Sequence, residues 1–231
     1  MVALITGFFI KSQYCGGSLV TDRLVLTAGH CIQNAYGGGK LISSLRIVAG
    51  SNRWNVGGTE YALTRNITHP HYLHHQLKND LGFLVTRDLV QLSATAQPVK
   101  MSYDFVGGDV RTRITGWGHV RHNGSTGSRV LLELYVDTIP SDVCVSEVIR
   151  MGQELNMRPP AVEPHIELCT YHSKGVGLCN GDSGSALVLA SSSLQVGVVS
   201  WSFPCARGAP DVYARISAYQ EFIEDTIANV G

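Results

Sequence analysis

The stretch Leu178-Cys179-Asn180-Gly181-Asp182-Ser183-Gly184 is the most informative part of this 231-residue chain. A serine between glycines most often belongs to a turn. Glycine before a serine also lets neighbouring backbone N–H groups converge without obstruction by a Cβ atom, as a pocket for an oxyanion requires. A nucleophilic role for Ser183 therefore depends on a base elsewhere in the chain, and on a carboxylate that orients this base.

Two upstream segments supply these partners. Leu26-Thr27-Ala28-Gly29-His30-Cys31 is an apolar strand that ends in a histidine beside a cysteine. In the second segment an aspartate leads into an apolar strand, with the sequence Asn79-Asp80-Leu81-Gly82-Phe83-Leu84. Either residue alone would usually be structural. Together with Ser183 they provide the base, the carboxylate and the nucleophile in the order His, Asp, Ser.

The composition favours a β-rich globular protein. Glycine accounts for 25 residues and charged residues for only 16 %, which indicates many turns and short strands. A hydrophobic content of 44 % excludes a disordered chain, and a formal net charge of zero argues against nucleic-acid partners and anionic membrane surfaces. The sequence contains no His-Glu-x-x-His, no Gly-x-Gly-x-x-Gly and no Gly-x-Ser-x-Gly motif, which narrows the possible chemistries.

Short apolar stretches separated by Gly, Asn, Asp or Pro recur along the chain and predict the strands of a sandwich or barrel. The Pro98 to Asp109 stretch is the expected crossover between an N-terminal and a C-terminal β unit. The predicted strands are Leu45 to Val48, Leu81 to Val85, Arg113 to Thr115, Leu131 to Val136, Ala186 to Leu189 and Val196 to Ser200.

Helices are expected at two places. Ser217 and Gln220 form a capping-box pattern at the start of a C-terminal helix. An apolar stripe follows, formed by Tyr219, Phe222, Ile223 and Ile227. A shorter helix is expected to begin near Ser141 and to carry Cys144.

These segments together resemble the chymotrypsin-like (trypsin-fold) serine endopeptidases, and the resemblance spans nearly the whole chain. It implies an all-β fold of two packed six-stranded antiparallel β-barrels with a C-terminal α-helix. The barrels would span residues 1–105 and 106–215, and the helix residues 216–231. Besides the His30, Asp80 and Ser183 segments, the resemblance rests on Cys15-Gly16-Gly17-Ser18-Leu19, Ile114-Thr115-Gly116-Trp117-Gly118, Ser200-Trp201-Ser202 and Pro210-Asp211-Val212-Tyr213-Ala214-Arg215.

The resemblance implies a role for each catalytic residue. His30 would act as general base and later as general acid, Asp80 would orient it, and Ser183 would attack the scissile carbonyl. The backbone N–H groups of Gly181 and Ser183 would form the oxyanion hole. No cofactor and no metal are expected. The function implied is a serine endopeptidase that works through an acyl-enzyme. The alternative is a non-catalytic homologue that acts as a binding or regulatory module.

The substrate would bind along Ser200, Trp201 and Ser202, and Gly177 would form the floor of the specificity pocket. A trypsin-like enzyme has Asp at the floor, so simple trypsin specificity is not expected. Asp211 stands on the pocket wall, where glycine is usual. Two readings stay open. Asp211 attracts Arg or Lys in a roomy pocket of broad specificity, or it is hydrogen-bonded within the wall of a chymotrypsin-like pocket. Ser202 replaces a glycine at the pocket mouth and would narrow the entry.

The six cysteines are even in number, dispersed and free of C-x-x-C spacing, which predicts three disulfides and an oxidising compartment. Two glycosylation sequons, at Asn66 and Asn123, agree with secretion to the extracellular space. The segment from Met1 to Ile10 is interpreted as a strand rather than a signal peptide. The resemblance implies the pairs Cys15–Cys31, Cys144–Cys169 and Cys179–Cys205.

One departure from the family concerns activation. Active members begin with a liberated Ile-Val-Gly-Gly terminus, whose ammonium pairs with the aspartate before the nucleophile. That aspartate would be Asp182. The sequence contains no Ile-Val-Gly-Gly and starts at Met1, within an early strand of the first barrel. The activation segment is therefore expected to be missing, with Asp182 unpaired and the oxyanion hole collapsed as in a zymogen.

Partners and metals complete the expectations. Protein or peptide substrates and protein protease inhibitors are the expected partners of a monomer, with no nucleic acid and no membrane. Glu60 stands nearly alone where some relatives hold calcium, so no calcium is expected. A histidine cluster before Asp80 is read as a solvated loop rather than a zinc site. Its members are His69, His71, His74 and His75.

Overall fold

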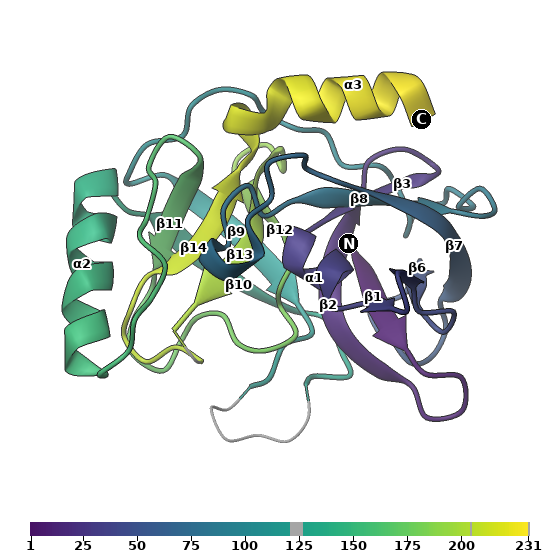
Figure 1. Cartoon of the computed structure of the whole chain (residues 1–231), viewed down its shortest axis with the longest axis horizontal. Helices are drawn as coiled ribbons and strands as arrows, with labels where there is room; N and C mark the ends of the chain where they lie inside the picture. The colour runs from purple at the N-terminus through teal and green to yellow at the C-terminus, as the bar shows by residue number, and fades with distance from the viewer. Residues whose placement is uncertain (121–126, 204, 231) are drawn as a thin grey trace.

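The computed structural model describes residues 1–120, 127–203 and 205–230, so the sequon at Asn123 lies outside the described residues. Its strands form two closed antiparallel barrels of six strands each, which stand side by side in Figure 1. Short strands between glycine-rich turns build both barrels, as the composition predicts. The predicted fold class is confirmed, and each of the six predicted strands overlaps an observed one.

The first barrel has the strand order β1-β2-β3-β8-β7-β6. Its inward side chains are almost all apolar, and β3 and β8 are buried along their whole length because neighbouring strands and helices cover both faces. Register is fixed across this pair by Val25 opposite Leu84. The strands are β1 Val2–Thr6, β2 Ser12–Leu19, β3 Leu24–Thr27, β6 Arg46–Ala49, β7 Thr59–Thr68 and β8 Gly82–Thr86.

The second barrel has the order β10-β11-β14-β13-β12-β9. The crossover between β8 and β9 contains the predicted Pro98 to Asp109 stretch. The strands are β9 Arg111–Gly116, β10 Leu132–Thr138, β11 Glu167–Tyr171, β12 Ala186–Leu189, β13 Gln195–Ser202 and β14 Asp211–Arg215. A separate two-stranded hairpin joins β4 Tyr36–Gly37 to β5 Lys40–Leu41.

The helices differ from the expectations in two details. The helix carrying Cys144, α2 Ser141–Glu154, has 14 residues and is longer than the C-terminal helix α3 Gln220–Val230, which has 11. A 3-10 turn over Ile216–Tyr219 precedes α3, so Ser217 lies inside this turn rather than at a helix N-cap. The remaining helices are α1 Gly29–Gln33 and a 3-10 turn at His74–Gln76. Within the described residues, no helix has the length and apolar character needed to cross a membrane.

One apolar core extends across both barrels. The cluster that fills the first barrel, including Leu26 and Phe83, also contains Val198 and Ala214 of the second barrel. Tyr219 and the C-terminal helix pack on the same cluster, as the predicted apolar stripe requires. A smaller cluster fills the second barrel, and a third lies between that barrel and α2. The two barrels therefore share buried surface rather than meeting only at polar edges.

Three disulfides fix the loops around this core. They join Cys15 to Cys31, Cys144 to Cys169 and Cys179 to Cys205, the same pairs that the resemblance implies. In the chain-entropy account, each closed loop of this size stabilises the fold by roughly 3 kcal/mol. The first bridge holds the residue after His30, and the third joins the Ser183 loop to the segment after β13.

Candidate active site

His30 follows β3 and Asp80 precedes β8. These two strands are neighbours in the first barrel, so the two residues lie close together. His30 lies in the first turn of α1, directly after β3, and Asp80 lies two residues before β8. The His30 Nδ1 atom is 2.8 Å from Asp80 Oδ2, and the His30 backbone N–H donates to Asp80 Oδ1 at 2.7 Å. Asp80 therefore holds both the ring and the backbone of the histidine.

Asp80 has a third donor from the second barrel. Ser200 in β13 donates its hydroxyl to Asp80 Oδ2 at 2.6 Å, and the carboxylate is only 1 % exposed. Burial lowers the pKa of His30, but the charge of Asp80 and the hydrogen bond to it outweigh burial and leave the pKa raised above its usual value. Such an environment favours the imidazolium form that a general base must pass through.

Ser183 lies in the loop before β12, at the junction of the barrels. Its carbonyl accepts a hydrogen bond from the Gly16 N–H of β2 at 2.7 Å, and the Gly184 N–H donates to Val199 O at 2.8 Å. Gly184 has a φ of +79°, and a Cβ atom there would lie 2.2 Å from Thr27 Oγ1. Only glycine fits this close approach, because a side chain would push the loop away from the first barrel.

The same contacts place Ser183 near His30. Gly16, bonded to Ser183, follows Cys15, and the Cys15–Cys31 bridge reaches the residue after His30. Within the described residues no hydrogen bond joins Ser183 to His30, and His30 Nε2 lies 3.7 Å from Cys31 Sγ. In enzymes without bound substrate, catalytic hydrogen bonds are often long or poorly aligned. The structure thus brings the three predicted catalytic residues to one region, with the His–Asp pair formed.

The loop before Ser183 leaves two backbone donors unused. Gly181 has a φ of +99°, a conformation that favours glycine, and its carbonyl accepts from Gln13 Nε2 at 2.8 Å. In the part of the chain that the structure describes, neither the Gly181 nor the Ser183 N–H donates to a protein acceptor. These are the two donors that an oxyanion pocket needs.

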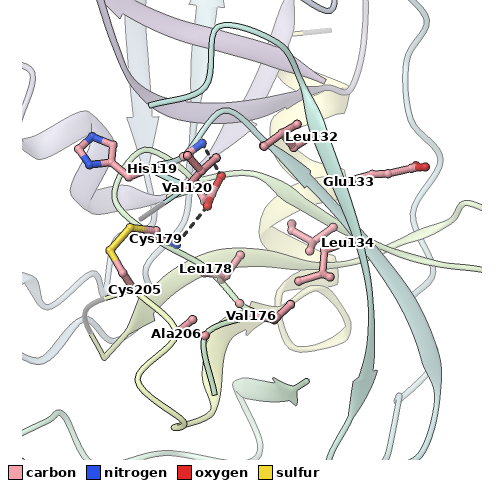
Figure 2. Close-up of a pocket in the computed structure, with 16 residues that line it drawn as sticks. His119, Val120, Leu132, Glu133, Leu134, Val176, Leu178, Cys179, Cys205 and Ala206 are labelled. Atoms are coloured by element: carbon pink, nitrogen blue, oxygen red, sulfur yellow. Dashed lines mark hydrogen bonds between the residues drawn. A yellow bond between two sulfur atoms is a disulfide. The ribbon is translucent and has the colours of Figure 1, made fainter. Parts of the chain in front are cut away.

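Asp182 forms no ion pair with any described residue, although two backbone N–H groups donate to its carboxylate. Gly118 N–H donates to Oδ1 at 2.8 Å and Cys179 N–H to Oδ2 at 3.1 Å, as the dashed lines in Figure 2 mark. A Cβ atom at Gly116 or Gly118 would lie 2.0 or 2.1 Å from the carboxylate oxygens, so both glycines are needed to seat it. Burial nevertheless raises the pKa of Asp182 to about 6.

A cavity of about 510 Å³ opens beside this carboxylate. Figure 2 shows Leu132 and Leu134 on one side and the Cys179–Cys205 bridge with Leu178 on the other. Besides Asp182, the lining residues are mostly apolar or glycine. The cavity therefore places the Asp182 carboxylate among largely apolar walls, with His119 and Glu133 also in the lining, and this arrangement suits a small apolar group that carries a positive charge.

Gly177 and Asp211 lie against each other. A Cβ atom at Gly177 would be 2.8 Å from Asp211 Oδ2, and the Leu178 N–H donates to the same oxygen at 3.1 Å. The other oxygen, Oδ1, receives no hydrogen bond from the described residues. Burial, followed by the nearby charge of Asp182, raises the pKa of Asp211 to about 7. Asp211 therefore has one internal donor and one oxygen without a partner in this part of the chain.

Among the described residues, the end of β13 pairs with a strand on one side only and so has a free edge. On one side Ser202 pairs with Asp211 of β14, but on the other side β12 reaches only as far as Val198. The backbone beyond Val199 is therefore available to an added strand, which is how extended peptides bind to sheet edges. Trp201 is buried, and its indole N–H donates to Glu167 Oε1 at 3.1 Å. Ser202 is half-buried.

The predicted histidine cluster does not converge on a point. In the described ranges, the only group of three potential metal ligands within 4.8 Å of one another is Cys15, His30 and Cys31. Both of its sulfurs belong to a disulfide, so they are not thiolate ligands. His74 instead contacts the Tyr72 hydroxyl at 2.9 Å through Nδ1.

Sequence reasoning missed three features of the site. Ser200 was expected to contribute its backbone, yet its hydroxyl also holds Asp80. Gly116 and Gly118 entered only as part of a motif, and they seat Asp182. The buried Lys78–Glu167 pair was not anticipated, because no local pattern relates residues 89 positions apart.

Comparison with known proteins agrees with this geometry. A family model described as trypsin matches residues 2–223. Trypsin beta of Drosophila erecta is 29 % identical over 213 residues, which cover 92 % of this chain and 78 % of the relative. Trypsin 5G1 of Aedes aegypti is 30 % identical over 218 residues, covering 93 % and 76 %. Trypsin of Phaedon cochleariae is 30 % identical over 216 residues, covering 92 % and 78 %.

Proposed function

Because the chain belongs to the trypsin family of serine proteases, we propose that it hydrolyses peptide bonds with Ser183, His30 and Asp80 as its catalytic triad. His30 takes the proton of the Ser183 hydroxyl while Oγ attacks the scissile carbonyl. The protonated His30 then gives that proton to the leaving amine, and an acyl-enzyme remains on Ser183. Water, deprotonated by the same histidine, releases the acid and restores the serine.

The observation that carries this proposal is the environment of Asp80. A carboxylate with three donors, of which His30 supplies two, fixes the tautomer and orientation of the imidazole. A structural aspartate would not need the ring of a histidine as one of its donors. The N–H groups of Gly181 and Ser183, which have no acceptor among the described residues, support an oxyanion hole, whose donors are worth roughly 3 kcal/mol each in a serine protease of unrelated fold.

The cavity beside Asp182 supports the activation chemistry implied by the family. The ammonium of a processed Ile-Val-Gly-Gly terminus would pair with Asp182, and its apolar side chains would fill the space among Leu132 and Leu134. Pairing with a cation would keep Asp182 ionised although burial raises its pKa.

For substrate preference we propose a broad primary pocket that accepts large apolar side chains and also Arg or Lys. Gly177 leaves the floor without a side chain, and Asp211 lies directly beside it with one oxygen lacking an internal donor. Both readings of Asp211 draw support from this arrangement, since Asp211 also accepts a hydrogen bond from the Leu178 N–H. Three disulfides support an extracellular setting. Proteins and peptides are the substrates, and protein inhibitors of serine proteases are the expected binding partners.

The test is labelling with a fluorophosphonate probe, which reacts only with an activated serine. The chain as printed and the chain preceded by a processed Ile-Val-Gly-Gly segment are compared, each with a Ser183→Ala control. Labelling of either form that disappears in the control supports the proposal. If neither form is labelled although circular dichroism shows both to be folded, the chain is instead a non-catalytic homologue that binds its partners.

A further inference from the structure

We propose that the buried ion pair Lys78–Glu167 is a positioning device that holds Trp201 for the binding of extended substrates. This inference rests on the proposed function, since it concerns how the same site recognises peptide beyond the cleaved bond. The pair joins the first barrel's Asp80 segment to β11 of the second barrel. Nothing in the catalytic chemistry of the triad requires it.

Both carboxylate oxygens of Glu167 have defined hydrogen-bond donors. Lys78 Nζ donates to Glu167 Oε2 at 2.7 Å, and both residues are only 3 % exposed. The Glu163 N–H donates to the same oxygen at 2.7 Å. The other oxygen, Oε1, accepts the indole N–H of Trp201 at 3.1 Å. Glu167 therefore uses one oxygen for the cation and the other for the tryptophan.

Burying two charges is costly, so such a pair gives little net stability compared with apolar side chains of the same size. Exposed pairs such as Arg111–Asp137, with both side chains more than half exposed, need no functional account. A buried pair whose acid also holds a residue of the proposed substrate strand is better explained by positioning.

The backbone conformation around Lys78 also supports a positioning role. Leu77 and Asn79, its two neighbours, both have a positive φ, of 50° and 52°. Non-glycine residues adopt this left-handed conformation at a cost and keep it only where the surroundings enforce it. The two kinks flank Lys78, which is buried two residues before Asp80. The ion pair thus helps to hold a strained segment that leads into the catalytic carboxylate.

The free edge of β13 is consequently tied to the first barrel at two successive residues. Ser200 bonds Asp80 directly, and Trp201 reaches Lys78 through Glu167. The first tie serves the triad. The second fixes the wall along which the part of the substrate preceding the cleaved bond would lie, so it should matter only for substrates long enough to reach it.

The experiment compares two substrates with the same residue at the cleaved bond, a single-residue ester and a tetrapeptide amide. The measured quantity is the ratio of kcat/KM for the long substrate to that for the short one. In Lys78→Met/Glu167→Met, which leaves no unpaired buried charge, this ratio should fall about tenfold, the effect of losing one well-placed hydrogen bond to a charged group. The matched control Arg111→Met/Asp137→Met removes an exposed pair and should leave the ratio within about twofold.

A second variant covers the case in which the double substitution does not fold. Trp201→Phe removes the indole N–H and should lower the same ratio. In a folded Lys78→Met/Glu167→Met background it should add little, because the two changes act through one interaction. A ratio that stays unchanged in either variant overturns the positioning role. The proposed protease function is judged separately, by whether the unsubstituted protein cleaves the ester and Ser183→Ala does not.

Discussion

The two buried carboxylates of the site, Asp80 in the first barrel and Asp211 in the second, are held in different ways. Asp80 accepts three hydrogen bonds from His30 and Ser200. Asp211 accepts one, from the Leu178 N–H, and its other oxygen has no donor among the described residues. A fully bonded carboxylate serves to orient another group, whereas a partly bonded one has capacity left for a ligand. The comparison suggests that Asp80 acts within the protein and Asp211 towards the substrate.

The largest effect is expected at Asp80, the carboxylate of the proposed triad. Asp80→Asn keeps the shape but reverses the hydrogen-bonding pattern that sets the tautomer of His30, so kcat should fall by about 10⁴-fold, as for the corresponding change in a related triad. Steady-state kinetics on an ester and an amide substrate would measure it. Asp137→Asn, at an exposed carboxylate, is the matched control. A loss below tenfold would show that Asp80 does not orient the base.

A smaller and selective effect is expected at Asp211, on the wall of the primary pocket. Asp211→Asn keeps the acceptor for Leu178 but removes the charge, so kcat/KM for Arg and Lys substrates should fall by about 100-fold, as when one partner of a buried charge pair is lost. Cleavage after Phe and Leu should stay within a few-fold of the starting value. Asp211→Gly, which also removes the side chain, should share the loss for Arg. Unchanged Arg cleavage in both variants would assign Asp211 to the pocket wall alone.

The smallest effect uses pH to change the charge of Asp211 without a substitution. Because its pKa is raised to about 7, the carboxylate is mostly ionised at pH 8 and mostly neutral at pH 6. The ratio of kcat/KM for Arg to that for Phe should therefore fall by about tenfold between these pH values. Protonation of His30 slows both substrates alike and cancels in the ratio. The ratio should be flat in Asp211→Asn. A ratio equally flat in the unsubstituted protein would contradict the assignment.

Local patterns were enough to predict the short strands of a sandwich or barrel, and the resemblance to the chymotrypsin-like proteases supplied the two barrels and the roles proposed for His30, Asp80 and Ser183. Short apolar stretches between turn residues define strands, and the three motifs occupy strand ends or a glycine-rich loop. The predicted start of the C-terminal helix was wrong, because the chain first makes a 3-10 turn over Ile216–Tyr219. The Ser217 to Gln220 pattern is compatible with a capping box and with such a turn. Local sequence does not distinguish the two.

Contacts between distant residues could not be predicted in this way. Whether Asp211 bonds within the wall or faces the pocket depends on Gly177 and Leu178, which only the folded second barrel brings against it. The Lys78–Glu167 pair likewise depends on how the barrels dock. Taken alone, a lysine two residues before Asp80 and a glutamate that opens a strand would each be interpreted as solvated charges.

The apolar core that runs through both barrels has a consequence for a cut chain. Leu89, at the start of the crossover, is 51 % exposed, so a protease could nick the backbone there. Val198 and Ala214 would still be buried among the side chains of the first barrel, in the same cluster as Ile223 of the C-terminal helix. The two fragments should stay together as one particle, visible as a single band on a native gel and as two bands only after denaturation.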